Sequence, residues 1–427
     1  MKCIAATILS LLLVTGLHAQ WKQDDIYTPF VMYKERTKLD QNLRENVIRK
    51  TFSLPLDSNT AYKYETACWA ITQFMVKTEE VENGFTKMIR FYDRLDADAR
   101  RSVLEAIYGN DRYAFVAPID SISQKEEDPA LFAMAAVYLS RASIRHNADL
   151  LVRMAEHFPA FDSTDILTEL QYYLNHHAAD IKNATPSIAD LFRFNTGRKI
   201  IYSFQRWNRD YPGLAIVQTA DGGFVRHPDG RLMVFQQLAR SGSDLPYFIT
   251  NGSTPQGVYS IRGVGVSHNN LIGPTPNIQM LLPFEGKWEN YFQLDSTAKW
   301  DSSQSTLAAY GSLWPASWRK YRPALEAYYA GKLGRTEIIA HGTTIDPEYF
   351  QDKPFYPLTP TLGCLCAREQ WNITTGRPTL SEQLGLVNAF LSTRGSKGFL
   401  FVINLDDQQK PVTREELEAI IKKSGLR

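Results

Sequence analysis

The stretch GLAIVQTADGGFVRHPDGRLMVF, residues 213–235, decides the fold class of the second half of the chain. It contains three apolar runs separated by two turn sequences, DGG at 221–223 and HPDG at 227–230. Glycine, proline and aspartate favour tight turns, and short apolar runs between such turns are typical of antiparallel strands. The stretch therefore predicts a β-meander that begins near residue 213.

The strand pattern continues toward the C-terminus. Further strands are predicted at 257–262, 337–340 and 399–405, and helices at 320–331 and 381–393. Thr413 and Glu416 match a capping box, which predicts the start of one more helix. We therefore predict a mainly β domain with short helices over residues 213–410, followed by a C-terminal helix over residues 411–427.

The first half of the chain has a helical period. Asp96 and Asp128 each precede a run in which apolar residues recur every three or four positions, as in a capped amphipathic helix. Ala-rich helices are predicted at 66–76, 97–108 and 129–143, beginning about 31 and 32 residues apart. This pattern predicts an all-α domain over residues 20–195, either a helical bundle or a HEAT/TPR-like array. Residues 196–212 are predicted to be the linker.

Residues 1–19 have the pattern of a secretory signal peptide. Lys2 precedes 15 uncharged residues, Cys3 to Leu17, and Ala19 ends a small-residue cleavage signal. This apolar run is shorter than the roughly 20 residues that a membrane-spanning helix needs. We therefore predict a periplasmic or extracellular protein without a transmembrane anchor in the mature chain, with a retained N-terminal anchor as the alternative.

Charge and cysteine content narrow the class of protein. Lys and Arg number 47 and Asp and Glu number 46, so the chain lacks the basic excess that nucleic-acid binding proteins carry. Removal of residues 1–19 takes away Cys3 and leaves Cys68, Cys364 and Cys366, an odd number of thiols. Cys68 is predicted either to be buried and unreactive in an apolar helix face or to form a disulfide with one of the other two.

The candidate catalytic residues are one histidine and one cysteine. His341 ends a predicted strand, and Cys364, a glycine-flanked thiol, follows 23 residues later. An imidazole can take the proton from a thiol, and glycine beside the thiol lets backbone N–H groups bind a carbonyl oxygen. A buried structural histidine and a disulfide-bonded cysteine are the alternatives. No residue pattern predicts a metal or an organic cofactor.

Three segments resemble motifs of the L,D-transpeptidase catalytic (YkuD-like) family, in the family's order. STPQGVYSI at 253–261 resembles its TPxGxY/F-x-I motif, AHGT at 340–343 its HGT motif, and TLGCL at 361–365 its S/T-H-G-C-I/V nucleophile motif. The resemblance covers roughly residues 213–405. It implies a β-sandwich-like fold and an exported cysteine acyltransferase that exchanges the terminal D-residue of peptidoglycan stem peptides through a thioester.

The resemblance also implies a role for each site residue. The catalytic set comprises Cys364 as nucleophile, His341 as base, Gly342 as a backbone group that orients His341, and Gly363, which with the Cys364 N–H forms the oxyanion hole. The predicted substrate-binding residues are Thr343, Thr361, Leu362 and Arg368. No metal is part of this site.

Three features depart from the family pattern. Leu362 stands where the family has His, and Cys366 stands where it has Arg or Asn, a role that Arg368 takes over only if the loop bends. The segment between His341 and the nucleophile is also about five residues longer than usual. Its central part, residues 347–357, is rich in aromatic residues and prolines and is predicted to wall or cover a cleft.

Two other functional hypotheses follow from the same residues. The main alternative is a non-catalytic cell-wall or protein-binding module with a degenerate transpeptidase-like domain. A papain- or NlpC-like peptidase fits less well, because in those enzymes the cysteine precedes the histidine. Since every candidate catalytic residue lies after residue 250, the helical half is predicted to be separable from the chemistry and to dock a protein partner.

Overall fold

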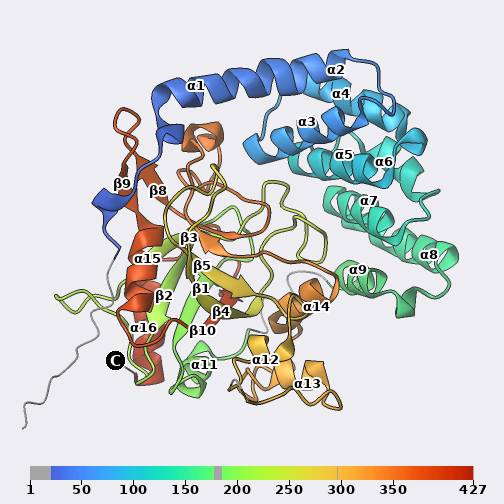
Figure 1. The fold of residues 1–427 in the computed structure, drawn as a ribbon. Helices are drawn as coiled ribbons and strands as arrows, with labels where there is room; N and C mark the ends of the chain where they lie inside the picture. The colour runs from blue at the N-terminus through green and yellow to red at the C-terminus, as the bar shows by residue number, and fades with distance from the viewer. Residues whose placement is uncertain (1–20, 177–184, 296, 427) are drawn as a thin grey trace, which may run out of the picture.

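The computed structural model describes residues 21–176, 185–295 and 297–426, so the predicted signal peptide lies outside the described residues. Helices fill the first part of the chain and a β-barrel with short helices fills the second, as Figure 1 shows. The coarse prediction of a helical half and a β half is therefore confirmed. Within the described residues, no helix is both long enough and apolar enough to cross a membrane.

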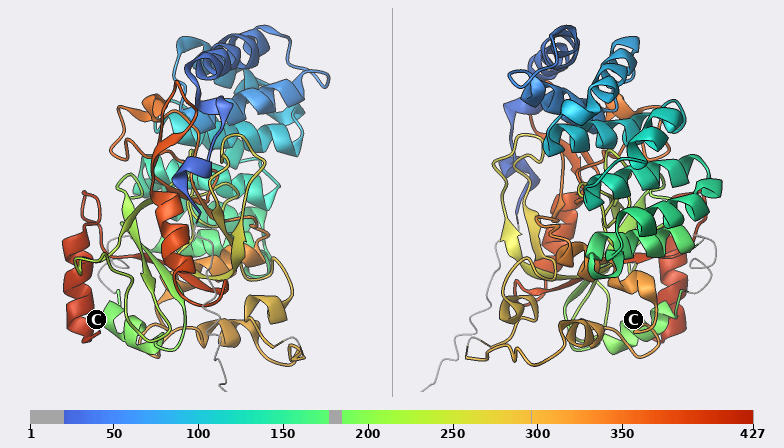
Figure 2. Two further views of the ribbon diagram at one scale, coloured as in Figure 1. Left: turned by 60° about the vertical axis from the view of Figure 1, so that its left-hand side comes forward. Right: turned by 90° about the vertical axis from the view of Figure 1, so that its right-hand side faces the viewer.

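The helices of the first half form consecutive layers. Their bounds are α1 Tyr33–Gln41, α2 Lys50–Ser53, α3 Ala61–Phe74, α4 Glu79–Arg90, α5 Ala97–Asn110, α6 Val116–Ser123, α7 Pro129–Ala142, α8 Asn147–His157 and α9 Asp165–Asn175. Helices α3, α5, α7 and α9 pack on one another in this order, as the right-hand view of Figure 2 also shows. The carboxylates of Asp96 and Asp128 accept hydrogen bonds from N–H groups of the first turns of α5 and α7, as predicted.

The β half contains a closed barrel of eight strands. The strands are β1 Ile200–Gln205, β2 Gly213–Gln218, β3 Phe235–Leu238, β4 Gly257–Gly265, β5 Asn277–Leu281, β6 Ala340–His341, β7 Leu365–Ala367 and β10 Gly398–Asn404. Their order is β1-β10-β4-β5-β6-β7-β3-β2. The prediction of a β-sandwich is wrong. The sheet closes into a barrel with no open edge, because β1 pairs with both β2 and β10, and β3 pairs with β7.

The range 196–212, predicted to be a linker, contains the barrel strand β1. All six residues of β1 are buried, and they pair in parallel with β10 and antiparallel with β2. A strand that is covered on both faces shows no polar and apolar alternation. The boundary between helical and β structure therefore lies earlier than the sequence analysis places it.

The remaining elements cover the barrel. They are α11 Ile188–Phe194, α12 Trp288–Tyr291, α13 Thr306–Gly311, α14 Glu326–Lys332, α15 Glu382–Leu391, α16 Arg414–Ser424 and the hairpin of β8 Glu369–Trp371 and β9 Pro378–Ser381. The predicted capping box of Thr413 and Glu416 is present at the start of α16. Helix α15 packs with residues from the barrel strands in one core, whereas α11 and α16 cover the other face of β1, β2 and β10.

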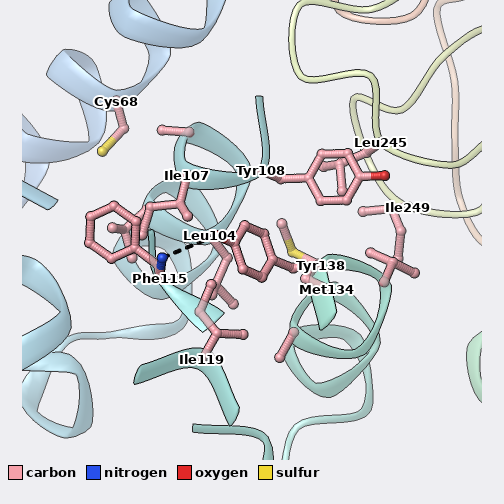
Figure 3. Packing of buried hydrophobic residues seen from close by; sticks show 14 of the residues in the cluster. Cys68, Leu104, Ile107, Tyr108, Phe115, Ile119, Met134, Tyr138, Leu245 and Ile249 are labelled. Carbon is pink, nitrogen blue, oxygen red and sulfur yellow. Dashed lines mark hydrogen bonds between the residues drawn. The ribbon is translucent and has the colours of Figure 1, made fainter. Parts of the chain in front are cut away.

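The core of the helical half is shared with the β half. Its buried cluster also contains apolar side chains from two loops of the β half, namely Leu245, Phe248, Ile249, Ile345, Phe350, Phe355 and Leu358. Figure 3 shows Leu245 and Ile249 beside Tyr108 of α5. Because these loops complete the helical core, the expectation that residues 20–195 are separable is not supported by the packing.

Candidate functional site

Strands β6 and β7 bring the two candidate catalytic residues into one region. The strands pair in parallel, with Ala340 opposite Leu365 and His341 opposite Cys366. Ala340 and Leu365 belong to the barrel core, so the side chains of His341 and Cys366 lie on the opposite face of the sheet. Cys364 directly precedes β7. The predicted histidine and cysteine therefore lie on adjacent segments of the sheet.

The imidazole of His341 is oriented by the backbone. Its Nδ1 lies 2.5 Å from the carbonyl oxygen of Gly342, which accepts a hydrogen bond from Nδ1–H. No described residue makes a hydrogen bond with Nε2. Burial lowers the pKa of His341 to about 4, so the ring is neutral at neutral pH. This arrangement fixes the tautomer and leaves the Nε2 lone pair as the available base. Gly342 thus occupies the orienting position that the resemblance implies.

The thiol of Cys364 contacts backbone groups. It donates to the carbonyl oxygen of Glu337 at 3.4 Å, and the N–H of Ile339 donates to Sγ at 3.5 Å. Burial raises the pKa of the Cys364 thiol to about 11. Among the described residues, no hydrogen bond joins Cys364 to His341. The thiol is therefore protonated and the imidazole neutral at neutral pH, and each makes its hydrogen bonds with backbone groups.

The backbone around the thiol is held in a specific shape. Gly363 has φ +118°, a conformation that side chains disfavour, and its N–H donates to Thr361 Oγ1 at 3.0 Å. Thr361 in turn donates to the carbonyl oxygen of Cys364 at 2.9 Å. The Cys364 N–H has no partner within the part of the chain that the structure describes. The Gly363 N–H, which the resemblance assigns to the oxyanion hole, is therefore already hydrogen-bonded to Thr361, and Thr361 holds the loop on both sides of this glycine.

A carboxylate that the sequence analysis missed lies beneath the HGT segment. Glu369, which is 3% exposed, accepts a hydrogen bond from the Thr343 N–H at 2.8 Å and another from Ser381 Oγ at 2.5 Å. A Cβ atom at Gly342 would lie 2.3 Å from this carboxyl group. Burial raises the pKa of Glu369 to about 7. Glu369 therefore supports the peptide whose carbonyl orients His341, and the glycine after His341 was its only sequence signal.

A second missed residue, Arg335, lies on the other side of the site. It is 7% exposed and donates to the carbonyl oxygens of Tyr247, Gly252 and Ser253. A Cβ atom at Gly363 would lie 2.3 Å from Nη2 of Arg335. Since Arg335 precedes β6 without a recognisable motif, only its position just before the predicted strand could have drawn attention to it.

The predicted substrate-binding residues differ in exposure. Leu362 is 38% exposed beside the thiol, whereas the Thr343 hydroxyl contacts Leu271 O and the N–H of Ile345. Arg368 is directed toward β3, where Nη1 donates to Gln236 Oε1 at 3.4 Å. Of the predicted four, Leu362 is therefore the residue most available to a ligand.

The other two described cysteines are buried. Cys366 is 1% exposed and contacts Thr359 Oγ1 at 3.5 Å, and burial raises its pKa to about 12. Cys68 is also 1% exposed and lies 3.6 Å from the Met88 sulfur. All three described cysteines are free thiols. Cys364 is thus the most accessible of the three.

The long segment between the histidine and the cysteine packs toward the helical half. Phe350 and Phe355 enter the helical core, while residues 344–353 form one wall of a cavity of about 630 Å³. The opposite wall comes from residues 30–44 and 74–77. The predicted aromatic segment therefore walls a cavity that begins directly after Thr343.

No family model, curated protein or solved structure matches the chain. Within the described ranges, no group of three His, Cys, Asp or Glu side chains is placed to hold a metal ion.

Proposed function

We propose that the chain is an exported cysteine acyltransferase that acts on peptidoglycan stem peptides through a thioester on Cys364. One observation carries this proposal. The parallel pairing of β6 with β7 places His341 beside the segment that contains Cys364, the most exposed of the described thiols. The Gly342 carbonyl orients the imidazole, and its Nε2 makes no hydrogen bond with any described residue. The free N–H of Cys364 adds a donor for the developing oxyanion. The order of the three family-like motifs supplies the substrate class.

The proposed chemistry has two acyl-transfer steps. His341 Nε2 takes the thiol proton as Cys364 Sγ attacks the carbonyl carbon of the donor peptide, so that a C–S bond forms. The C–N bond then breaks, and the imidazolium returns the proton to the leaving amine. In the second step His341 Nε2 takes a proton from the acceptor nucleophile as this attacks the thioester carbonyl, the C–S bond breaks, and the imidazolium returns the proton to Cys364 Sγ. The thiol contact with Glu337 O must be exchanged for the imidazole in the first step.

Two features of the structure support a slow or substrate-dependent enzyme within this proposal. The pKa values of about 11 for Cys364 and about 4 for His341 oppose formation of a thiolate and imidazolium pair in the resting state. Because both values result mainly from burial, we expect the thiol proton to move to the imidazole only as Sγ attacks the carbonyl carbon of a bound substrate, so that a free thiolate does not accumulate. The acylation rate is expected to rise with pH.

Acylation by a carbapenem-type β-lactam tests the proposal directly. Intact mass of the protein without residues 1–19 is expected to show a single adduct, which Cys364→Ala abolishes and Cys366→Ala retains. Cys366 is the matched control because it is a thiol two residues away that is 1% exposed. His341→Gln is expected to slow acylation at least 100-fold, in the range typical of a lost general base. An adduct that survives in Cys364→Ala would overturn the assignment.

A non-catalytic binding module is the second candidate function. The contact of the Cys364 thiol with Glu337 O, in place of the imidazole, favours it. In that case the cavity of about 630 Å³ would hold the ligand, and Cys364 would serve to fix the loop. Purified peptidoglycan incubated with the protein separates the two functions, because only the enzyme changes the masses of the stem peptides.

A further inference from the structure

We propose that Arg335 is a positioning residue whose guanidinium stabilises the thiolate of Cys364 through the Gly363 backbone. This inference rests on the proposed function, since it assigns the cation that a thiol nucleophile needs. The sequence resemblance does not include Arg335, which lies six residues before His341.

The guanidinium packs directly against the backbone of the nucleophile loop. A Cβ atom at Gly363 would lie 2.3 Å from Arg335 Nη2 and 2.8 Å from the carbonyl oxygen of Gly252. That same carbonyl accepts a hydrogen bond from Nη2 at 2.7 Å. Gly363 is therefore required for two reasons, its φ of +118° and the guanidinium that occupies the position of a side chain. This close approach places the guanidinium against the residue that precedes Cys364.

The charge of Arg335 is not balanced by an acid. It donates to the three carbonyl oxygens, and no carboxylate within the described ranges forms a salt bridge with it. A buried cation without a counterion is costly, and burial lowers its pKa to about 10. A thiolate on Cys364 would supply the missing negative charge.

The other charged groups near the thiol act in the opposite direction. The carboxylates of Glu285 and Glu337 raise the pKa of Cys364, whereas the Arg335 guanidinium lowers it. The Ile339 N–H that contacts Sγ also lowers it, and His341 is neutral. Arg335 is thus the cation that offsets the two acids.

Arg209 provides a matched comparison. It is 8% exposed, donates to the carbonyl oxygen of Thr254 at 3.1 Å, and therefore holds the same turn as Arg335. Burial also lowers the pKa of Arg209 to about 10, but the nearby acid is Glu326. Loss of either arginine removes support from the turn. Only loss of Arg335 removes a positive charge from the environment of Cys364.

The test is the pH profile of Cys364 alkylation by iodoacetamide, followed by intact mass in a Cys366→Ala background. Arg335→Met is expected to raise the thiol pKa by about one unit, which lowers the thiolate fraction roughly tenfold at pH values below the pKa. Arg335→Lys retains the charge and is expected to stay within a few tenths of a unit. Arg209→Met is expected to leave the thiol pKa unchanged. Circular dichroism reports whether each variant folds.

Each outcome decides the inference separately from the proposed function. If Arg335→Met and Arg209→Met give the same profile, Arg335 only supports the turn and the inference is overturned. If Arg335→Met does not fold, Arg335→Gln decides, because it keeps a donor for the turn carbonyls but removes the charge, and an unchanged alkylation profile in that variant overturns the inference. A shifted profile for Arg335→Met in a protein that never forms a β-lactam adduct would retain the inference and reject the acyltransferase.

Discussion

The two sides of the barrel are built differently. On one side, β1, β2, β4 and β10 have six to nine residues each and form continuous ladders of backbone hydrogen bonds. On the other side, β3, β5, β6 and β7 have two to five residues, and a single residue pair joins β5 to β6. We call these the long-strand side and the short-strand side. The candidate site lies on the short-strand side.

The short-strand side is stabilised by side chains instead of ladders. Gln383 donates to the carbonyl oxygen of Ala340 at 2.9 Å, Glu369 accepts from the Thr343 N–H, and Arg335 holds the turn at 252–253. The helical half adds a further contact, in which Gln73 donates to the carbonyl oxygen of Pro360 at 3.1 Å. The comparison teaches that the site depends on a few polar groups and on the helices, while the long-strand side is a scaffold.

Removal of the helices is expected to have the largest effect. A fragment of residues 198–427 exposes the apolar side chains of the loops at 245–249 and 345–358, which the helical core now buries. We expect this fragment to aggregate or to bind a hydrophobic dye, as measured by light scattering and ANS fluorescence. A soluble fragment whose Cys364 alkylation profile equals that of the longer protein would show that the short-strand side stands alone.

Two phenylalanines allow the two sides of the barrel to be compared at equal burial, because both side chains are 0% exposed. Phe401 lies on the long-strand side against Trp314, and Phe350 lies in the segment that packs on the helices. Phe401→Ala and Phe350→Ala are each expected to lower the free energy of unfolding by about 3–5 kcal/mol in urea titrations. Only Phe350→Ala is expected to change Cys364 alkylation in the folded protein. Equal alkylation rates in the two variants would contradict the division into scaffold and site.

The carboxylate beneath the HGT segment is expected to cause a smaller, pH-dependent effect. Burial raises the pKa of Glu369 to about 7 in the folded protein, above its usual value. The free energy of unfolding therefore contains a favourable term from the protonated carboxyl group, which is fully present below the unfolded-state pKa and is lost as the pH rises to 7. Between about pH 4.5 and 7 the loss amounts to about 3 kcal/mol. Glu369→Gln is expected to remove this slope in urea titrations at several pH values. A slope that is the same in both proteins would contradict the burial argument.

Replacement of Leu362 is expected to have the smallest effect on stability. Because the side chain is 38% exposed, Leu362→His is expected to change the free energy of unfolding by less than about 0.5 kcal/mol. The added imidazole can donate near the Cys364 N–H, so the acylation rate is expected to be kept or raised. Intact mass against time measures this rate, with Leu362→Gln as the uncharged control. A Leu362→His variant that no longer reacts would indicate a pocket built around an apolar residue.

The sequence predicted the regular elements better than the short ones. The caps at Asp96, Asp128 and Thr413 are local signals, and each marks a real helix. Strand β1 has the residues of a buried strand, IIYSFQ, but it was assigned to the linker because the composition around it is polar. Strands β7 and β8 have three residues each, which is too short for a period to be visible.

The candidate site could be predicted only in part for the same reason. His341 and Cys364 were found because adjacent glycines mark them, and β6 and β7 do lie side by side. Glu369 and Arg335 were missed because their relation to those glycines exists only after the chain has folded around β6. The closure of the sheet into a barrel was also not visible, since it depends on pairs between distant strands. Whether the site is catalytic stays a prediction.

The parallel pairing of β1 with β10 has a consequence for folding. Ile200 pairs with Phe399, and β10 lies between β1 and β4 in the sheet. Nearly 200 residues must therefore be synthesised after β1 before the barrel can close. Contacts between such distant segments make folding slow, because the entropy of the intervening loop is lost before the contacts form. The barrel of such a chain cannot close until β10 is available to pair with both β1 and β4.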